Sequence, residues 1–104
     1  MKALLISAVL CGLLLPGISL GQDQPLSGEE VYNKSCAACH KTGLAGAPKL
    51  GDTSAWESRI KKGMDELYES SLEGKGAMPA KGGDRTLSDA AVKAAVDFMI
   101  NASK

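Results

Sequence analysis

The chain contains little of what most enzymes and nucleic-acid-binding proteins depend on. Its 104 residues include one histidine and four aromatic residues, and 12 Lys and Arg balance 12 Asp and Glu. A balanced charge gives no electrostatic footprint for nucleic acid or for an anionic membrane surface. No alternating pattern of apolar and polar residues indicates a strand, and no internal repeat is present. These absences give no indication of a nucleic-acid-binding or membrane-binding surface, of a β-sheet or of a repeat protein.

A long hydrophobic run is also missing, because a membrane-spanning helix needs about 20 apolar residues. The longest apolar run, residues 3–15, follows Lys2 and ends at Pro16, and small residues follow it up to Gly21. This arrangement is typical of a secretory signal peptide. We expect residues 1–21 to be removed and residues 22–104 to form one soluble domain without stable membrane insertion, in the periplasm of a Gram-negative bacterium.

Three cysteines are present, and Cys11 lies inside the expected signal peptide. A lipid anchor on Cys11 is disfavoured because the bulky Leu10 precedes it. The mature chain then has two cysteines, both in the run Cys36-Ala37-Ala38-Cys39-His40.

Two thiols three positions apart and followed at once by histidine form the attachment signature of c-type haem. In that chemistry Cys36 and Cys39 each add to a vinyl group of the porphyrin, and His40 binds the iron. A local disulfide is the plainest alternative. A zinc site needs about four ligands, and a thioredoxin-like pair needs a βαβ surround that is not indicated.

The scarcity of aromatic residues and the presence of 12 Gly also favour a bound cofactor. A chain this short buries a limited fraction of its surface and usually needs a metal, a cofactor or disulfides to fold. One covalent haem at the centre would serve as a ready-made apolar core. We therefore expect little stable structure without it.

Helical patterns account for most of the mature chain. Ser27 and Glu30 form a capping box, which predicts a helix running to Cys36. Three further helices are expected: over residues 54–62, capped by Asp52 or Thr53 and stopped at Gly63; over residues 64–73; and from Ser88 to the C-terminus. Two loops rich in Gly and Pro separate them, at residues 43–51 and 74–83. The prediction is an all-α fold with about four to five short helices wrapped around one haem.

The second axial ligand of the iron decides between electron transfer and ligand chemistry. The candidates in the mature chain are Met64, Met78 and Met99. Met64 and Met99 fall on apolar helical faces, where methionine usually fills gaps in the core. Met78 lies in an irregular loop directly before Pro79, where its side chain can reach the iron. His40 and Met78 are the predicted pair.

The chain resembles the small class I c-type cytochromes over nearly all of its mature length. The resemblance rests on the pattern Gly28-x-x-x-Tyr32-x-x-x-Cys36-Ala37-Ala38-Cys39-His40, then Gly46-Ala47-Pro48-Lys49-Leu50-Gly51, then Ala77-Met78-Pro79-Ala80. Trp56, Gly63-Met64-Asp65 and the stretch from Met78 to Gly83 are most similar to the bacterial cytochrome c-five group. Many members of that group carry a second cysteine pair before the last helix, whereas this chain has Gly82-Gly83-Asp84-Arg85-Thr86.

The resemblance implies roles for residues around the haem. The carbonyl of Pro48 would accept a hydrogen bond from the ring of His40, which fixes the tautomer of a ligating histidine. Trp56 would pack beside the haem, where its N–H can reach a propionate, although core packing alone is nearly as plausible. Arg59 is a weaker propionate candidate, because an arginine on a solvated helix face is common.

Two positions of the first helix have structural roles in this family. Gly28 would allow the last helix to approach closely, and Tyr32 would lie where Phe98 of that helix crosses.

The sequence therefore favours a diffusible one-electron carrier rather than an enzyme. Its partners would be a redox protein donor and acceptor, such as a cytochrome complex, an oxidase or a reductase, and the carrier itself would be a monomer or a weak dimer. A peroxidase needs acid–base groups beside an open iron position, and the chain has no histidine besides His40. An electron-entry subunit and a gas or redox sensor remain alternatives, and both gain weight if Met78 is not a ligand.

Overall fold

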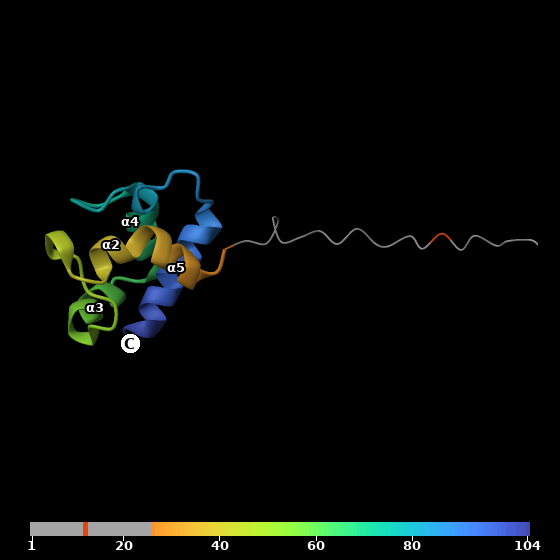
Figure 1. The fold of residues 1–104 in the computed structure, drawn as a ribbon. Coiled ribbons are helices and arrows are strands. Elements are labelled where there is room, and N and C mark those ends of the chain that lie inside the picture. The colour runs from red at the N-terminus through yellow and green to blue at the C-terminus, as the bar shows by residue number, and fades with distance from the viewer. Residues whose placement is uncertain (1–11, 13–25) are drawn as a thin grey trace, which may run out of the picture.

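The computed structural model describes Gly12 and residues 26–104, so the expected signal peptide lies almost entirely outside the described residues. Within residues 26–104 the chain forms helices and connecting loops with no strand (Figure 1). The elements follow in the order α1 Gly28–Val31, η1 Tyr32–Cys36, α2 Ala37–His40, η2 Leu44–Gly46, α3 Thr53–Ile60, α4 Met64–Glu73, η3 Ala80–Gly83 and α5 Asp89–Ala102. The expected all-α class is confirmed.

The first helical body runs without interruption from α1 through η1 to α2. The Ser27 hydroxyl accepts a hydrogen bond from the Glu30 amide, as a capping box requires. The carboxylate of Glu30 accepts from the Ser27 hydroxyl instead of from the Ser27 amide, so only half of the reciprocal pattern forms. The middle segment η1 is a π-helix, a local widening that the apolar pattern does not predict.

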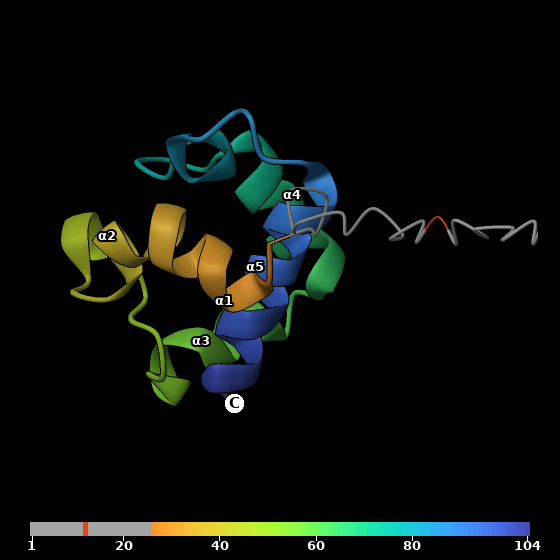
Figure 2. The same cartoon turned by 45° about the vertical axis from the view of Figure 1, so that its right-hand side comes forward.

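The last helix, α5, crosses the first body at α1 (Figure 2). A Cβ atom added to Gly28 would lie 2.1 Å from the backbone oxygen of Ala94 and 3.2 Å from Cβ of Phe98. The rings of Tyr32 and Phe98 pack with their centroids 5.4 Å apart. Both roles expected at this crossing are therefore confirmed.

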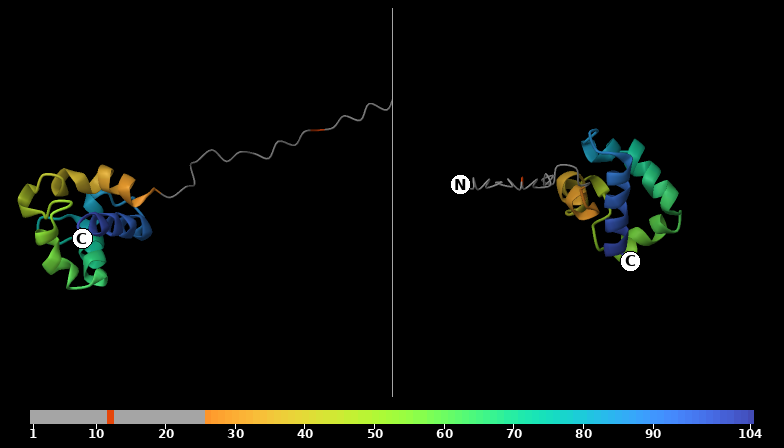
Figure 3. Two further views of the ribbon diagram at one scale, coloured as in Figure 1. Left: turned by 90° about the horizontal axis from the view of Figure 1, so that it is seen from below. Right: turned by 90° about the vertical axis from the view of Figure 1, so that its right-hand side faces the viewer.

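Helices α3 and α5 begin where their capping residues predict. Asp52 caps α3 by accepting from the Ala55 amide, and Ser88 caps α5 by accepting from the Ala91 amide. Helix α3 ends at Ile60, two residues before the predicted end, and a turn leads to Gly63. Helix α4 packs beside α5 (Figure 3).

A small core lies between these elements. Three of its buried members come from α5, one from the first helical body and one from α3: Val96, Met99, Ile100, Tyr32 and Trp56. Partly buried side chains of α4 pack against them. None of the helices within residues 26–104 has the length and hydrophobicity needed to cross a bilayer.

Candidate haem site

His40 ends the first helical body and is fixed by the loop that follows. It is only 7% exposed, and its Nδ1 lies 2.8 Å from the Pro48 carbonyl oxygen. A carbonyl can only accept, so Nδ1 carries the proton and donates. The His40 carbonyl in turn accepts from the Leu50 amide at 2.7 Å. These two contacts fix the ring and leave Nε2 as the nitrogen with a free lone pair.

Trp56 reinforces the same loop. Its indole N–H donates to the Lys49 carbonyl at 2.8 Å, and its ring lies 5.8 Å from the His40 ring, centroid to centroid. The residue is 6% exposed. Its N–H therefore already has a protein acceptor, which differs from the propionate contact expected from the sequence.

A cavity of about 510 Å³ opens beside these residues. That volume falls within the range of roughly 300–1,000 Å³ that is usual for cofactor sites. Its walls come from the first helical body, α3, α4, α5 and both loops, and they include Cys36, Cys39, His40, Pro48, Trp56, Arg59, Leu67, Met78, Val96 and Met99. Residues far apart in the sequence therefore share one predominantly apolar hollow.

Cys36 and Cys39 are not joined by a disulfide, so the disulfide alternative does not describe this structure. Burial raises the pKa of the Cys36 thiol, and the neighbouring Cys39 raises it further. Among the described residues, no group of three or more His, Cys, Asp or Glu side chains is placed to hold a metal ion. A zinc site within residues 26–104 is therefore not supported.

Met78 lies on the wall of the cavity, in a tight hairpin. The amide of Met78 donates to the Lys75 carbonyl and the amide of Lys75 donates to the Met78 carbonyl, both at 3.0 Å. This isolated bridge and the 3₁₀ turn η3 give regular structure to a loop for which none was expected.

The other two methionines lie as core residues. Met64 begins α4 and packs against the core without lining the cavity. Met99 is 5% exposed on α5, and it does line the cavity. The cavity wall thus offers two thioethers, one on a loop and one on a helix.

Arg59 also reaches the cavity wall, and its guanidinium donates to the Ala55 carbonyl of its own helix. The structure gives this side chain a backbone partner, so its expected role at a propionate remains a prediction.

The residues present fit a covalently attached haem. Two thiols and an imidazole with Nε2 free line one apolar cavity of suitable volume, and the only imidazole is held by a backbone acceptor. Such a partner is typical of a histidine that binds a metal. The arrangement defines a c-type cytochrome with a single haem.

Comparison with known proteins agrees with this class of protein. The family model described as "Cytochrome C oxidase, cbb3-type, subunit III" matches residues 23–99. The chain is similar to cytochrome c-555 of Chlorobaculum tepidum, with 48% identity over 95% of this chain and 96% of that protein. It is also similar to cytochrome c5 of Azotobacter vinelandii, with 49% identity over 70% of this chain and 90% of that protein.

A solved structure of an electron transfer complex of nitrite reductase with cytochrome c gives a TM-score of 0.71 at 44% identity. The match covers 74% of this chain and 94% of that one. The chain belongs to the family of small class I c-type cytochromes. It carries one covalent haem c and acts as an electron carrier, not as an enzyme.

Two functional contacts were not predicted from the sequence. The Lys49 carbonyl that accepts from Trp56 gives no signal, because a backbone acceptor is independent of residue type. Ser103 follows the last periodic residue of α5, and its fully buried hydroxyl accepts from the Gly51 amide at 2.9 Å. A polar residue at a helix end is usually expected to face solvent, so this contact could not be predicted without knowledge of the fold.

Proposed function

We propose that this cytochrome is a soluble periplasmic carrier of single electrons, with its haem iron held between His40 and Met78, in a respiratory or related electron-transfer chain. The observation that carries the proposal is that both side chains line one cavity while Nδ1 of His40 is held by Pro48. When bound, haem c supplies an iron that cycles between the ferrous and ferric states.

The residues of the chain determine how that couple behaves. The contact of His40 with Pro48 orients the imidazole and makes Nε2 a better donor. A thioether supplied by Met78 would favour the ferrous state and raise the reduction potential. With His40 and Met78 both holding the iron, small molecules would be excluded, and the protein would exchange electrons without making or breaking bonds in a substrate.

The rim of the cavity suits brief docking with redox partners. Leu44 is 59% exposed, and the neighbouring Ala45 and Ala47 share the rim with Ala77 of the Met78 loop. Small apolar contacts of this kind are typical of transient electron-transfer complexes. A similar cytochrome c forms an electron transfer complex with nitrite reductase, so a periplasmic reductase is one candidate acceptor. The carrier would act as a monomer or a weak dimer.

The axial ligand is tested by the near-infrared band that arises between a methionine sulfur and ferric iron. We expect the oxidised wild-type protein to show this band and Met78→Ala to lack it. Met99→Leu and Met64→Leu are the matched controls, because each removes another thioether and nearly conserves volume.

A band that persists in Met78→Ala and disappears in Met99→Leu would assign the ligand to α5 and refute the proposed pair. Rapid binding of carbon monoxide by the wild-type ferrous protein would also contradict it, because an open iron position belongs to an enzyme or a sensor.

A further inference from the structure

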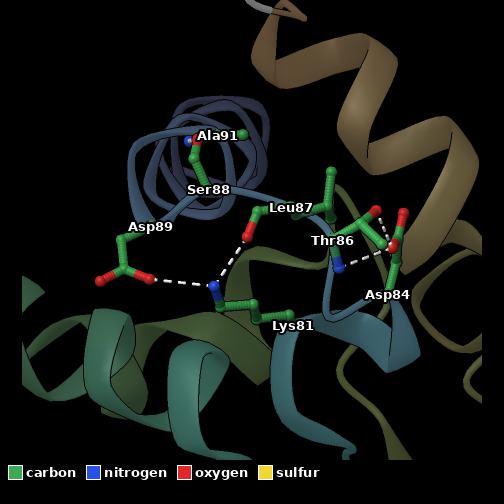
Figure 4. Close-up of polar contacts among 7 residues, drawn as sticks. All are labelled: Lys81, Asp84, Thr86, Leu87, Ser88, Asp89 and Ala91. Atoms are coloured by element: carbon green, nitrogen blue, oxygen red, sulfur yellow. Dashed lines mark hydrogen bonds and ion pairs between the residues drawn. The ribbon is translucent and has the colours of Figure 1, made fainter.

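The loop that carries Met78 is fastened to the start of α5 by a lysine side chain (Figure 4). Lys81 lies three residues after Met78, within η3. Its Nζ donates to the Leu87 carbonyl at 2.7 Å and lies 3.1 Å from Oδ1 of Asp89. The Lys81 side chain is 22% exposed, whereas that of Asp89 is 70% exposed.

The backbone of Lys81 indicates that this placement is not incidental. Its φ of +54° is in the left-handed region, which is disfavoured for a residue with a β-carbon. The next residue, Gly82, lies so close to the first helical body that an added Cβ would be 2.6 Å from the Ser35 carbonyl oxygen. The turn η3 therefore packs between the first helical body and the start of α5.

The segment between Lys81 and α5 is itself ordered by hydrogen bonds. The Asp84 amide donates to the Lys81 carbonyl at 3.1 Å, and the Asp84 carboxylate accepts from both the amide and the hydroxyl of Thr86 (Figure 4). The Leu87 amide donates back to the Asp84 carbonyl. The carbonyl that receives the lysine is thus part of a fixed series of turns.

We propose that Lys81 is a positioning residue that keeps the Met78 loop closed over the haem cavity. This inference rests on the proposed ligation by Met78. Only Pro79 and Ala80 separate the two residues, so the chain between them spans at most about 11 Å and transmits any displacement. The bridge between Lys75 and Met78 holds the loop from the other side. Met78 can swing away only if one of these anchors yields.

The two contacts of the Lys81 side chain do not contribute equally to holding the Met78 loop. A charged donor to the Leu87 carbonyl makes a strong hydrogen bond, and little water reaches this side chain. The ion pair with Asp89 is largely exposed on one side, and exposed pairs are weak and screened by salt. The carbonyl contact therefore carries most of the restraint.

The test measures the rate at which imidazole replaces the methionine on the ferric iron of the haem-loaded protein. The reaction is monitored by the loss of the near-infrared band. The iron–sulfur bond must break before the iron–nitrogen bond forms, so the rate follows the population of open loop. We expect Lys81→Met to react about tenfold faster than wild type or more, and Lys81→Arg to restore most of the slow rate. Asp89→Asn should change the rate by less than about threefold.

The matched control is Lys61→Met, which removes a lysine from the exposed ion pair with Glu57 on α3. It should react at the wild-type rate. Wild-type rates in Lys81→Met, with the band lost in Met78→Ala, would overturn the role of Lys81 alone. A band that persists in Met78→Ala would refute the ligation on which the role depends.

Discussion

At the scale of single residues, the site is organised by backbone carbonyls that act on side chains. Pro48 and Lys49 present consecutive carbonyls, the first to the His40 ring and the second to the Trp56 indole. The sequence motif singled out His40 and both cysteines, and the structure places all three on the wall of one cavity. The motif did not identify the acceptor of Trp56, since any residue supplies a carbonyl.

Tyr68 provides a residue-scale prediction on pH. Its hydroxyl donates to Asp97, and this hydrogen bond, followed by partial burial and nearby carboxylates, raises the pKa of Tyr68. A raised pKa in the folded state means that the contribution to stability is complete below the pKa of the unfolded chain, near 10, and is lost as the pH rises through the folded value.

Tyr68→Phe should therefore be less stable than wild type by a constant amount between pH 6 and 9, and the difference should shrink at higher pH. Denaturant unfolding of both proteins across this range measures the difference directly. A difference that grows above pH 10 would contradict the assignment of the donor.

At the scale of secondary-structure elements, prediction succeeded where a local signal fixes a boundary. Helix α4 has the predicted bounds of Met64–Glu73, and Ser88 caps α5 as expected. The π-helical segment η1 and the bridge at Met78 were missed. Both depend on packing between segments, which local periodicity does not record.

The crossing of α1 and α5 gives an element-scale prediction. Gly28→Ala places a methyl group against the Ala94 carbonyl, so the two helices must separate. Although alanine favours helix, we expect a net loss of about 1–3 kcal/mol in the free energy of unfolding. Denaturant unfolding measures it, with Asn33→Ala at an exposed position of the same helical body as the control. Unchanged stability in Gly28→Ala would contradict this prediction, because it would show that the two helices separate without a cost in free energy.

At the scale of the whole molecule, the end of α5 is joined to the loop at residues 43–51, which also carries Pro48. Ser103 is fully buried, and its hydroxyl accepts from the Gly51 amide, three residues after Pro48. This contact joins segments 52 residues apart.

Ser103→Ala should lower the free energy of unfolding by about 0.5–1.5 kcal/mol, because the hydrogen bond between the Gly51 amide and the buried Ser103 hydroxyl is lost. Ser54→Ala, on the exposed surface of α3, is the control and should stay within about 0.5 kcal/mol of wild type. Equal stabilities of Ser103→Ala and wild type would mean that water replaces the hydroxyl.

The central cavity predicts how the molecule depends on its cofactor. A chain of this size cannot leave about 510 Å³ at its centre unfilled and keep a stable core. The haem-free chain with Cys36→Ala and Cys39→Ala should lose most of its helical circular dichroism and unfold without cooperativity. A native-like spectrum with a cooperative transition would refute a structural role for the haem.

A potentiometric titration of the haem absorption bands tests the central claim most directly. We predict one reversible one-electron transition in the wild-type protein and a transition at clearly lower potential in Met78→His, since a second imidazole stabilises ferric iron relative to a thioether. An unchanged potential in Met78→His, or a wild-type titration that is not a one-electron process, would contradict a carrier that works through His40 and Met78.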